Sequence, residues 1–297
     1  MAEDRENKLI IVPGKKRIGK SNETLRNIFF DLIPVGRKAL FLDINNEYGE
    51  YKIYLPDGST KVVKIKRILH SDIQAFSSQT TIEAARVIPM NDNGTKMTND
   101  QIDLAWVNAM DEFKGGTLVV EDLNKIFGDQ LPKSVSGALT NNTHRDSDIY
   151  LHIQSIGRVV PKMRQNAEII RMHFEFNSMM DMEGKLGGET QMFRIAQLII
   201  NHQYYPGMAL IKKNPTDLQG QRMIRQLVFV NREESKLTGD FTRRMLWVAI
   251  MDYLSSNKWE FQPYLDKMDI HGKKVFTHFQ AMEKKGIELF NLYWGND

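Results

Sequence analysis

The sequence contains no cysteine, and this absence excludes a disulfide-stabilised scaffold, a thiolate zinc site, an iron–sulfur cluster and cysteine catalysis. Proline and glycine are sparse, with 9 and 20 among 297 residues, so a collagen-like or low-complexity chain is excluded as well. No stretch approaches the roughly 18 consecutive apolar residues of a transmembrane helix. The chain opens on the acidic MAEDREN, which is unlike the basic start of a signal peptide. We therefore expect a cytoplasmic protein with no membrane span.

An excess of charge of one sign is also missing, because 40 lysines and arginines face 37 aspartates and glutamates, for a net charge of +3. This net charge is too small to indicate nucleic-acid binding through bulk charge alone, so any such contact must be local. The 7 histidines include no metal-spaced set, and we interpret His144, His152 and His173 as polar or packing residues. A hydrophobic fraction of 41% is typical of a globular protein with a sizeable core.

The first 44 residues predict a strand, a helix and a second strand. Residues 8–13 (KLIIVP) form a short apolar run that ends at Gly14, as a buried strand before a tight loop does. Residues 21–33 carry apolar side chains at helical spacing, and residues 38–44 (KALFLDI) predict the second buried strand. A βαβ unit of this kind predicts an α/β fold built on a parallel sheet.

Further elements follow along the chain. Residues 51–67 alternate around a Pro-Asp-Gly turn and predict a hairpin, and a helix is expected from Thr98 or Asn99 to about Phe113. The remaining predicted strands are residues 117–120, 149–153, 167–176 and 226–231, and the remaining helices are 133–144, 189–202, 241–255 and 274–292. We divide the chain into a core of residues 1–235 and a helical C-terminal extension of residues 236–297.

Residues 14–21 (GKKRIGKS) match the phosphate-loop pattern G-x-x-x-x-G-K-[ST] at every fixed position. Glycines let the loop turn successive N–H groups toward a phosphate, and the dipole of the following helix favours the same anion. The Lys20 ammonium would contact the β- and γ-phosphates of ATP, and the Ser21 hydroxyl would bind Mg²⁺. A chance match is the alternative, but the motif follows a strand and opens a helix, as the mechanism requires. The expected nucleotide-binding residues are Gly14, Lys15, Lys16, Arg17, Ile18, Gly19, Lys20 and Ser21.

Two carboxylates stand at the end of the apolar strand TLVV, where a Walker B motif is expected. One carboxylate there orients Mg²⁺ through its water, and a second accepts a proton from the attacking water. We assign Glu121 to the metal and Asp122 to water activation. The alternative is that the two acids only end a strand and cap the next helix.

With these motifs the sequence resembles P-loop ATPases of the FtsK-HerA type, which include virus and phage genome-packaging ATPases and zonular-occludens-toxin-like phage proteins. The resemblance spans residues 8–176. It also rests on residues 41–51 (FLDINNEYGEY), which look like the family's acidic second-strand segment, and on residues 143–176, where a strand ends at Gln154. It implies a RecA-like core whose mostly parallel sheet is flanked by helices, and a role for Gln154 in sensing the γ-phosphate.

Two features depart from the family. Its members usually order the second acidic motif Asp then Glu, the reverse of Glu121 and Asp122, which leaves the division of roles between the two open. The toxin-like members carry a membrane segment that this sequence lacks. We therefore favour DNA packaging or translocation over membrane-coupled extrusion.

The resemblance further implies a ring motor, a pentamer or hexamer, in which an arginine of one subunit reaches the γ-phosphate bound by its neighbour. The candidates are Arg145, Arg158, Arg164 and Arg171, of which Arg158 and Arg164 lie just beyond the sensor strand. Any of them is otherwise an ordinary surface residue.

Basic residues gather at residues 61–67 and between residues 212 and 225, and either cluster could follow DNA phosphates. A solvated face is the simpler explanation of both. The aromatic residues of the C-terminal extension indicate a packed appendage or a surface for a capsid or portal partner.

The sequence thus predicts an ATP-hydrolysing translocase of double-stranded DNA, with viral genome packaging as the first interpretation. In that case the protein would act in the host cytoplasm or at a virion vertex. The alternatives are a plasmid or host DNA-processing translocase, an ATP-binding assembly switch without motor activity, and a small-molecule kinase. GTP is disfavoured because residues 124–127 (NKIF) lack the final Asp of a guanine-reading motif.

Overall fold

The computed structural model describes most of the chain, namely residues 7–55, 58–122, 146–175, 177–179, 181–213, 227–230 and 243–294. The chain divides into two compact units, residues 1–176 and residues 177–297. The boundary that we expected between residues 235 and 236 lies outside the described residues, and so does the helix expected at 133–144.

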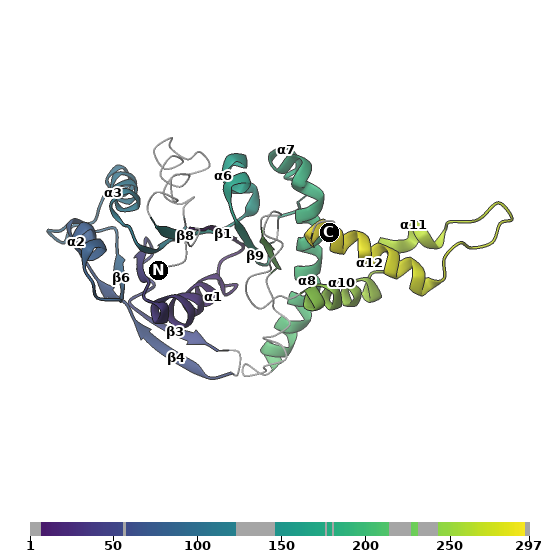
Figure 1. Cartoon of the computed structure of the whole chain (residues 1–297), viewed down its shortest axis with the longest axis horizontal. Helices are drawn as coiled ribbons and strands as arrows, with labels where there is room; N and C mark the ends of the chain where they lie inside the picture. Colours follow the sequence, from purple (N-terminus) through teal and green to yellow (C-terminus); the bar gives the residue numbers. More distant parts are fainter. Residues whose placement is uncertain are drawn as a thin grey trace, which may run out of the picture. The chain divides into compact units, whose positions relative to one another are not determined.

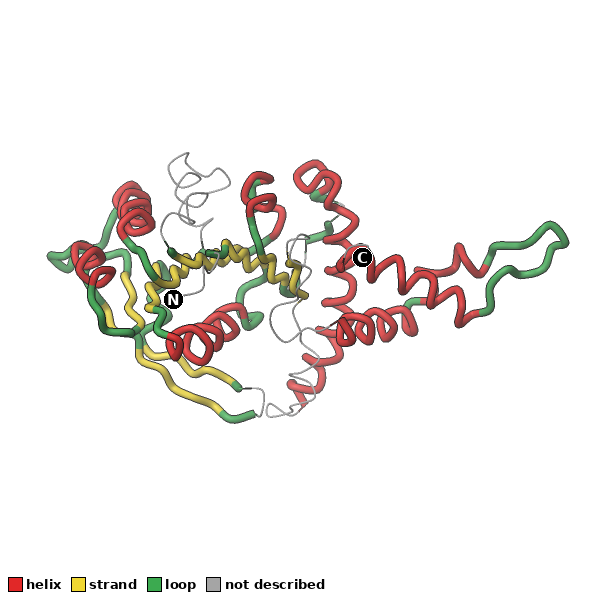
Figure 2. The backbone as a smooth tube through the Cα atoms, in the orientation of Figure 1, coloured by secondary structure: helices red, strands yellow, loops and turns green. Residues whose placement is uncertain are grey.

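Seven strands of the first unit form its central sheet. Their order across the sheet is β9 (Ile169–Met172), β1 (Leu9–Pro13), β8 (Ser147–Ile153), β7 (Gly116–Val120), β2 (Lys38–Leu42), β6 (Ala84–Val87) and β5 (Lys66–Arg67). Every neighbouring pair among them runs parallel. Helices α1 (Lys20–Arg26) and α6 (Pro161–Asn166) lie on opposite faces of the sheet (Figure 1; Figure 2). The predicted P-loop NTPase fold with a parallel sheet is therefore confirmed.

Four central strands are buried at every position, which explains why their sequences read as continuous apolar runs. Strand β8 lies between β1, which precedes the phosphate loop, and β7, which precedes Glu121. All three strands end at the same edge because they run parallel. The side chains that follow them are thereby brought together.

The helix after the phosphate loop begins as predicted and changes its winding along its length. Helix α1 (Lys20–Arg26) continues into a π-helical turn, η1 (Asn27–Leu32), and a 3-10 turn, η2 (Ile33–Val35). Leu25 and Ile28 are fully buried. Gly36, at φ 90°, ends the helical segment in a left-handed conformation that suits glycine.

Helix α3 (Asn99–Glu112) confirms the prediction of a capped helix at this place. The Thr98 hydroxyl accepts a hydrogen bond from the Gln101 N–H, and the Gln101 side chain accepts one from the Thr98 N–H, which forms a capping box. One face of the helix buries Trp106, which has no exposed surface. The helix is thus defined both by its cap and by its apolar face.

Trp106 supplies a test of this packing. We expect Trp106→Ala to lower the free energy of unfolding by about 3–5 kcal/mol, because it removes a large, fully buried side chain and leaves a cavity. Leu104→Ala in the same helix is the control, since Leu104 is 64% exposed and its loss should cost no more than about 0.5 kcal/mol. Urea unfolding followed by circular dichroism measures both. Equal losses in the two variants would contradict the packing of α3.

A two-stranded antiparallel hairpin branches from the sheet between β2 and β5. It pairs β3 (Glu50–Tyr54) with β4 (Thr60–Lys64), as the alternating sequence predicted. The end of the predicted hairpin was wrong, because Lys66 and Arg67 form β5 of the central sheet. Strand β6 and helix α2 (Ile73–Ser78) were not predicted. Both are too short to show a clear period in the sequence.

The second unit is mainly helical. Its elements are α7 (Glu183–Leu186), α8 (Thr190–Lys213), β10 (Leu227–Val230), α10 (Arg243–Ser256), α11 (Gln262–Leu265) and α12 (His278–Trp294). Helices α10 and α12 pack together where the ring of Trp247 meets Phe290 edge-on at 6.0 Å between centroids. Among the described helices of the whole chain, none combines the length and apolarity needed to cross a membrane.

Candidate active site

The phosphate loop is anchored to the ends of two strands of the sheet. The Gly14 N–H donates to the Ile153 carbonyl at 3.0 Å, and the Lys15 N–H donates to the Phe174 carbonyl at 3.0 Å. Gly14 has a φ of 148°, and a Cβ atom on it would lie 2.6 Å from the Cβ of His173. Gly19, at φ 95°, is the left-handed residue that starts helix α1. Both glycines of the motif are therefore required by the backbone that they form.

The Lys20 side chain lies inside the loop. Its ammonium donates to the Gly14 carbonyl and, at 3.1 Å, to the Lys15 carbonyl, and the residue is 8% exposed. Burial lowers the pKa of Lys20, although the nearby carboxylates of Glu121 and Asp122 oppose this shift. The loop thus holds one buried cation where the motif places it. Lys15, Lys16 and Arg17 are exposed, and Ile18 is half-buried.

Glu121 is 7% exposed and directly follows β7. Its Oε1 accepts hydrogen bonds from the Ser21 hydroxyl at 3.2 Å, from His152 Nδ1 at 2.6 Å and from the Tyr48 hydroxyl. The structure therefore brings together Ser21 and Glu121, the two residues expected to bind the metal.

A hydroxyl and a carboxylate oxygen at this separation fit Mg²⁺, which prefers hard oxygen ligands. Within the described residues, no cluster of three or more His, Cys, Asp and Glu side chains could hold a metal ion. The phosphates of a bound nucleotide and water would have to supply the other ligands, as is usual for Mg²⁺ at nucleotide sites.

Asp122 lies beside the loop with a φ of 46°, an uncommon left-handed conformation for a residue other than glycine. Its Oδ1 accepts from Gln154 Nε2 at 3.3 Å and its Oδ2 from Asn45 Nδ2 at 3.0 Å. Burial raises the pKa of Asp122, but these hydrogen bonds and the charges of Lys16 and Lys20 outweigh it and lower the pKa overall. Asp122 is thus held as a carboxylate, in contact with the predicted sensor Gln154.

The arginine candidates differ in their surroundings. Arg158 ends the short 3-10 turn η5 (Ile156–Arg158) and is exposed. Arg164 and Arg171 are each 5% exposed, and their guanidinium groups donate to the Val159 carbonyl at 2.7 Å and to Asn27 Oδ1 at 2.5 Å. An arginine buried within its own subunit is poorly placed to reach a neighbour, so this burial argues against Arg164 and Arg171 as trans fingers. Arg145 lies outside the described residues.

Several site residues were missed as individuals by the sequence analysis. Asn45 and Tyr48 belong to the acidic segment 41–51, which had been noted only as a whole. Asp43 anchors that segment, because its carboxylate accepts from the backbone N–H groups of Glu47 and Tyr48 at 2.8 and 2.9 Å. Arg86 Nη1 donates to the same carboxylate at 3.0 Å. The sequence signal for Asp43 was its position directly after the apolar strand β2.

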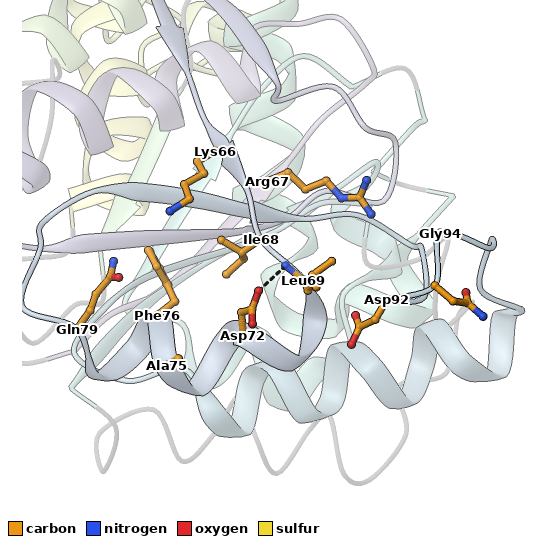
Figure 3. A pocket seen from close by; sticks show the side chains of 11 residues that line it. Lys66, Arg67, Ile68, Leu69, Asp72, Ala75, Phe76, Gln79, Asp92 and Gly94 are labelled. Atoms are coloured by element: carbon orange, nitrogen blue, oxygen red, sulfur yellow. Dashed lines mark hydrogen bonds between the residues drawn. The ribbon is translucent and has the colours of Figure 1, made fainter.

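A separate cavity of about 660 Å³ lies at the β5 edge of the sheet (Figure 3). Its lining includes Lys66, Arg67 and Asp72, and Figure 3 shows the Asp72 carboxylate accepting from the Leu69 N–H, at 3.3 Å. None of the phosphate-loop residues lines it. The cavity is therefore distinct from the nucleotide site.

The parallel sheet, the loop between β1 and α1, and the paired acids after β7 together define a P-loop nucleoside-triphosphatase fold. No protein-family model and no curated protein sequence matches the chain.

Similar solved structures include the genome packaging NTPase of Sulfolobus turreted icosahedral virus 2 in complex with AMP, at 14% identity, with 79% of this chain and 98% of that chain covered and a TM-score of 0.42. The N-terminal domain of zonular occludens toxin from Neisseria meningitidis is 12% identical over 58% of this chain and 78% of that chain, with a TM-score of 0.34. The pCW3 conjugation coupling protein TcpA, with ATPgS, is 14% identical over 63% of this chain and 54% of that chain, also with a TM-score of 0.34. The chemistry of the site rests on the contacts described above.

Proposed function

We propose that this protein is an ATP-hydrolysing DNA translocase, acting as an oligomeric ring in viral genome packaging. The observation that carries the proposal is the convergence of the phosphate loop, the Glu121 and Asp122 pair and Gln154 at one edge of the sheet. A translocase of plasmid or host origin shares the same site. It differs in its DNA substrate and not in its chemistry.

The residues divide into those that hold the nucleotide and those that act on water. The loop N–H groups and the Lys20 ammonium would bind the β- and γ-phosphates, and Ser21 and Glu121 would hold Mg²⁺. When bound, Mg²⁺ would neutralise charge that develops on the phosphates. Asp122 would accept the proton of the attacking water, and Gln154, which already contacts Asp122, would report the presence of the γ-phosphate.

A ring requires an arginine that reaches the neighbouring subunit, and DNA binding requires an exposed basic surface. Arg158 is the arginine that we place at the neighbouring subunit's nucleotide, because it is exposed and lies on the turn after β8. For DNA we propose the basic segment of residues 61–67. Lys64 and Lys66 keep 78% and 66% of their side chains exposed, although they lie near Glu50 and Glu83. Of the second basic cluster, only residues 212 and 213 are described.

DNA dependence is the test of this function. We expect double-stranded DNA to raise the steady-state rate of ATP hydrolysis, and the apparent DNA affinity to fall with salt, because phosphate contacts release counterions. Lys64→Ala and Lys66→Ala should each reduce the slope of log affinity against log salt by about one. Lys96→Ala, which removes an exposed lysine elsewhere, is the control. Tight ATP binding with no turnover, with or without DNA, would instead support an assembly switch.

A further inference from the structure

His152 is a buried residue whose two ring nitrogens both make hydrogen bonds beside the phosphate loop. It lies on β8 with no exposed surface, opposite Val12 of the neighbouring strand β1. Its Nδ1 is 2.6 Å from Glu121 Oε1, and its Nε2 is 2.8 Å from the hydroxyl of Thr24. Thr24 is also fully buried and belongs to helix α1. The imidazole thus joins the helix after the phosphate loop to the first acid after β7.

The two partners determine which ring nitrogen carries the proton. A carboxylate only accepts hydrogen bonds, so Nδ1 donates to Glu121. Thr24 can then donate its hydroxyl proton to Nε2, which satisfies both nitrogens of a neutral imidazole. Both hydrogen bonds are shielded from water, where an unmade one would carry the full cost of desolvation.

The hydrogen bonds of Glu121 are concentrated on one oxygen. Ser21, Tyr48 and His152 all contact Oε1, and in the described part of the chain no donor reaches Oε2. The donors therefore set the rotation of the carboxylate and leave Oε2 for a metal-bound water. Of the three, Ser21 belongs to helix α1, and His152 is held to the same helix through Thr24.

We propose that His152 is a positioning residue of the nucleotide site, which orients the Glu121 carboxylate for Mg²⁺ and is itself oriented by Thr24. The inference rests on the proposed nucleotide function and adds to it a buried connection between the phosphate-loop helix and the metal-binding acid. Partners of this kind, behind a metal ligand, commonly change metal affinity about 10–100-fold when they are removed. The same hydrogen bonds would exist in a merely structural histidine, so the test must distinguish one nitrogen from the other.

Two amide substitutions separate the nitrogens. His152→Asn can place its amide N–H near Nδ1 and keep the bond to Glu121, whereas His152→Gln can reach toward Thr24 and lose the bond to Glu121. The measurement is calorimetric titration of a non-hydrolysable ATP analogue at a series of Mg²⁺ concentrations, which requires no turnover. We expect His152→Gln to raise the Mg²⁺ concentration needed for half-maximal binding by about tenfold or more, and His152→Asn by less than about threefold.

Thr24→Val supplies a second test in case His152→Gln fails to fold. It keeps the shape of the side chain but removes the hydroxyl that orients the imidazole, so we expect an intermediate rise in the Mg²⁺ requirement with unchanged binding of the analogue at saturating Mg²⁺. Equal Mg²⁺ requirements in the two His152 variants, or in Thr24→Val and the wild type, would overturn the positioning role. Absence of Mg²⁺-dependent analogue binding in the wild type would overturn the nucleotide function itself, which keeps the two failures distinct.

Discussion

Lys20→Ala is expected to lower kcat/KM for ATP by about 10²–10³-fold, the loss that follows removal of one preorganised charge from a transition state. Lys20 is the buried cation of the loop, and its ammonium lies against the carbonyls of Gly14 and Lys15. Charge develops on the γ-phosphoryl oxygens during transfer, and a fixed ammonium stabilises it without reorganisation. Release of inorganic phosphate at saturating Mg²⁺ measures the loss.

Lys114→Ala is the control for this prediction. Lys114 is an exposed lysine that lies outside the phosphate loop, shortly before β7. Its rate should stay close to that of the wild type. Circular dichroism would verify that Lys20→Ala keeps the fold. Hydrolysis that survives in folded Lys20→Ala would contradict the assignment of residues 14–21 as the catalytic phosphate loop.

Asp122→Asn is expected to reduce kcat by about 10²–10⁴-fold while leaving the affinity for ATP and Mg²⁺ nearly unchanged. The amide keeps the size of the side chain. It can accept from one of Asn45 and Gln154 and donate to the other if that side-chain amide flips, but it cannot accept a proton from water. Glu121→Gln should behave differently, because Glu121 is the acid in contact with Ser21. It should weaken Mg²⁺-dependent nucleotide binding together with turnover.

Single-turnover hydrolysis and analogue binding, measured on both variants, separate these effects. The two assignments are exchanged if Asp122→Asn raises the Mg²⁺ requirement and Glu121→Gln leaves it unchanged. In that case Asp122 would be the metal ligand and Glu121 the group that accepts a proton from water. Unchanged turnover in both variants would remove the acids from the mechanism altogether.

The elements that position the site could be predicted because their signals are local. Strands β1, β2 and β7 are buried on both faces and read as apolar runs, and the loop motif and the Thr98 cap are short contiguous patterns. Strand β6 escaped prediction because four residues show no reliable period. The π-helical turn after α1 likewise has no sequence signature that we could identify.

The contacts within the site were less predictable because they join residues far apart in the chain. His152 was interpreted as a polar or packing residue, and only the neighbouring strands β7 and β8 bring it to Glu121. Arg164 was a candidate finger from its place after the sensor strand, but burial of a side chain depends on tertiary packing that one sequence does not display. Gln154 was selected through the family resemblance, and the structure places its side chain beside Asp122.

The contacts of Lys20 also bear on how nucleotide enters and leaves. Because its ammonium is already bound by two carbonyls of its own loop, arrival of a phosphate is an exchange of ligands around one cation and not the neutralisation of a bare charge. An ammonium has only three N–H donors, so contacts with both the β- and γ-phosphates would require at least one of these carbonyl bonds to break, which would reduce the net affinity. They can form again as the product departs, and so favour its release. The phosphate loop thus contains an internal competitor for its own lysine.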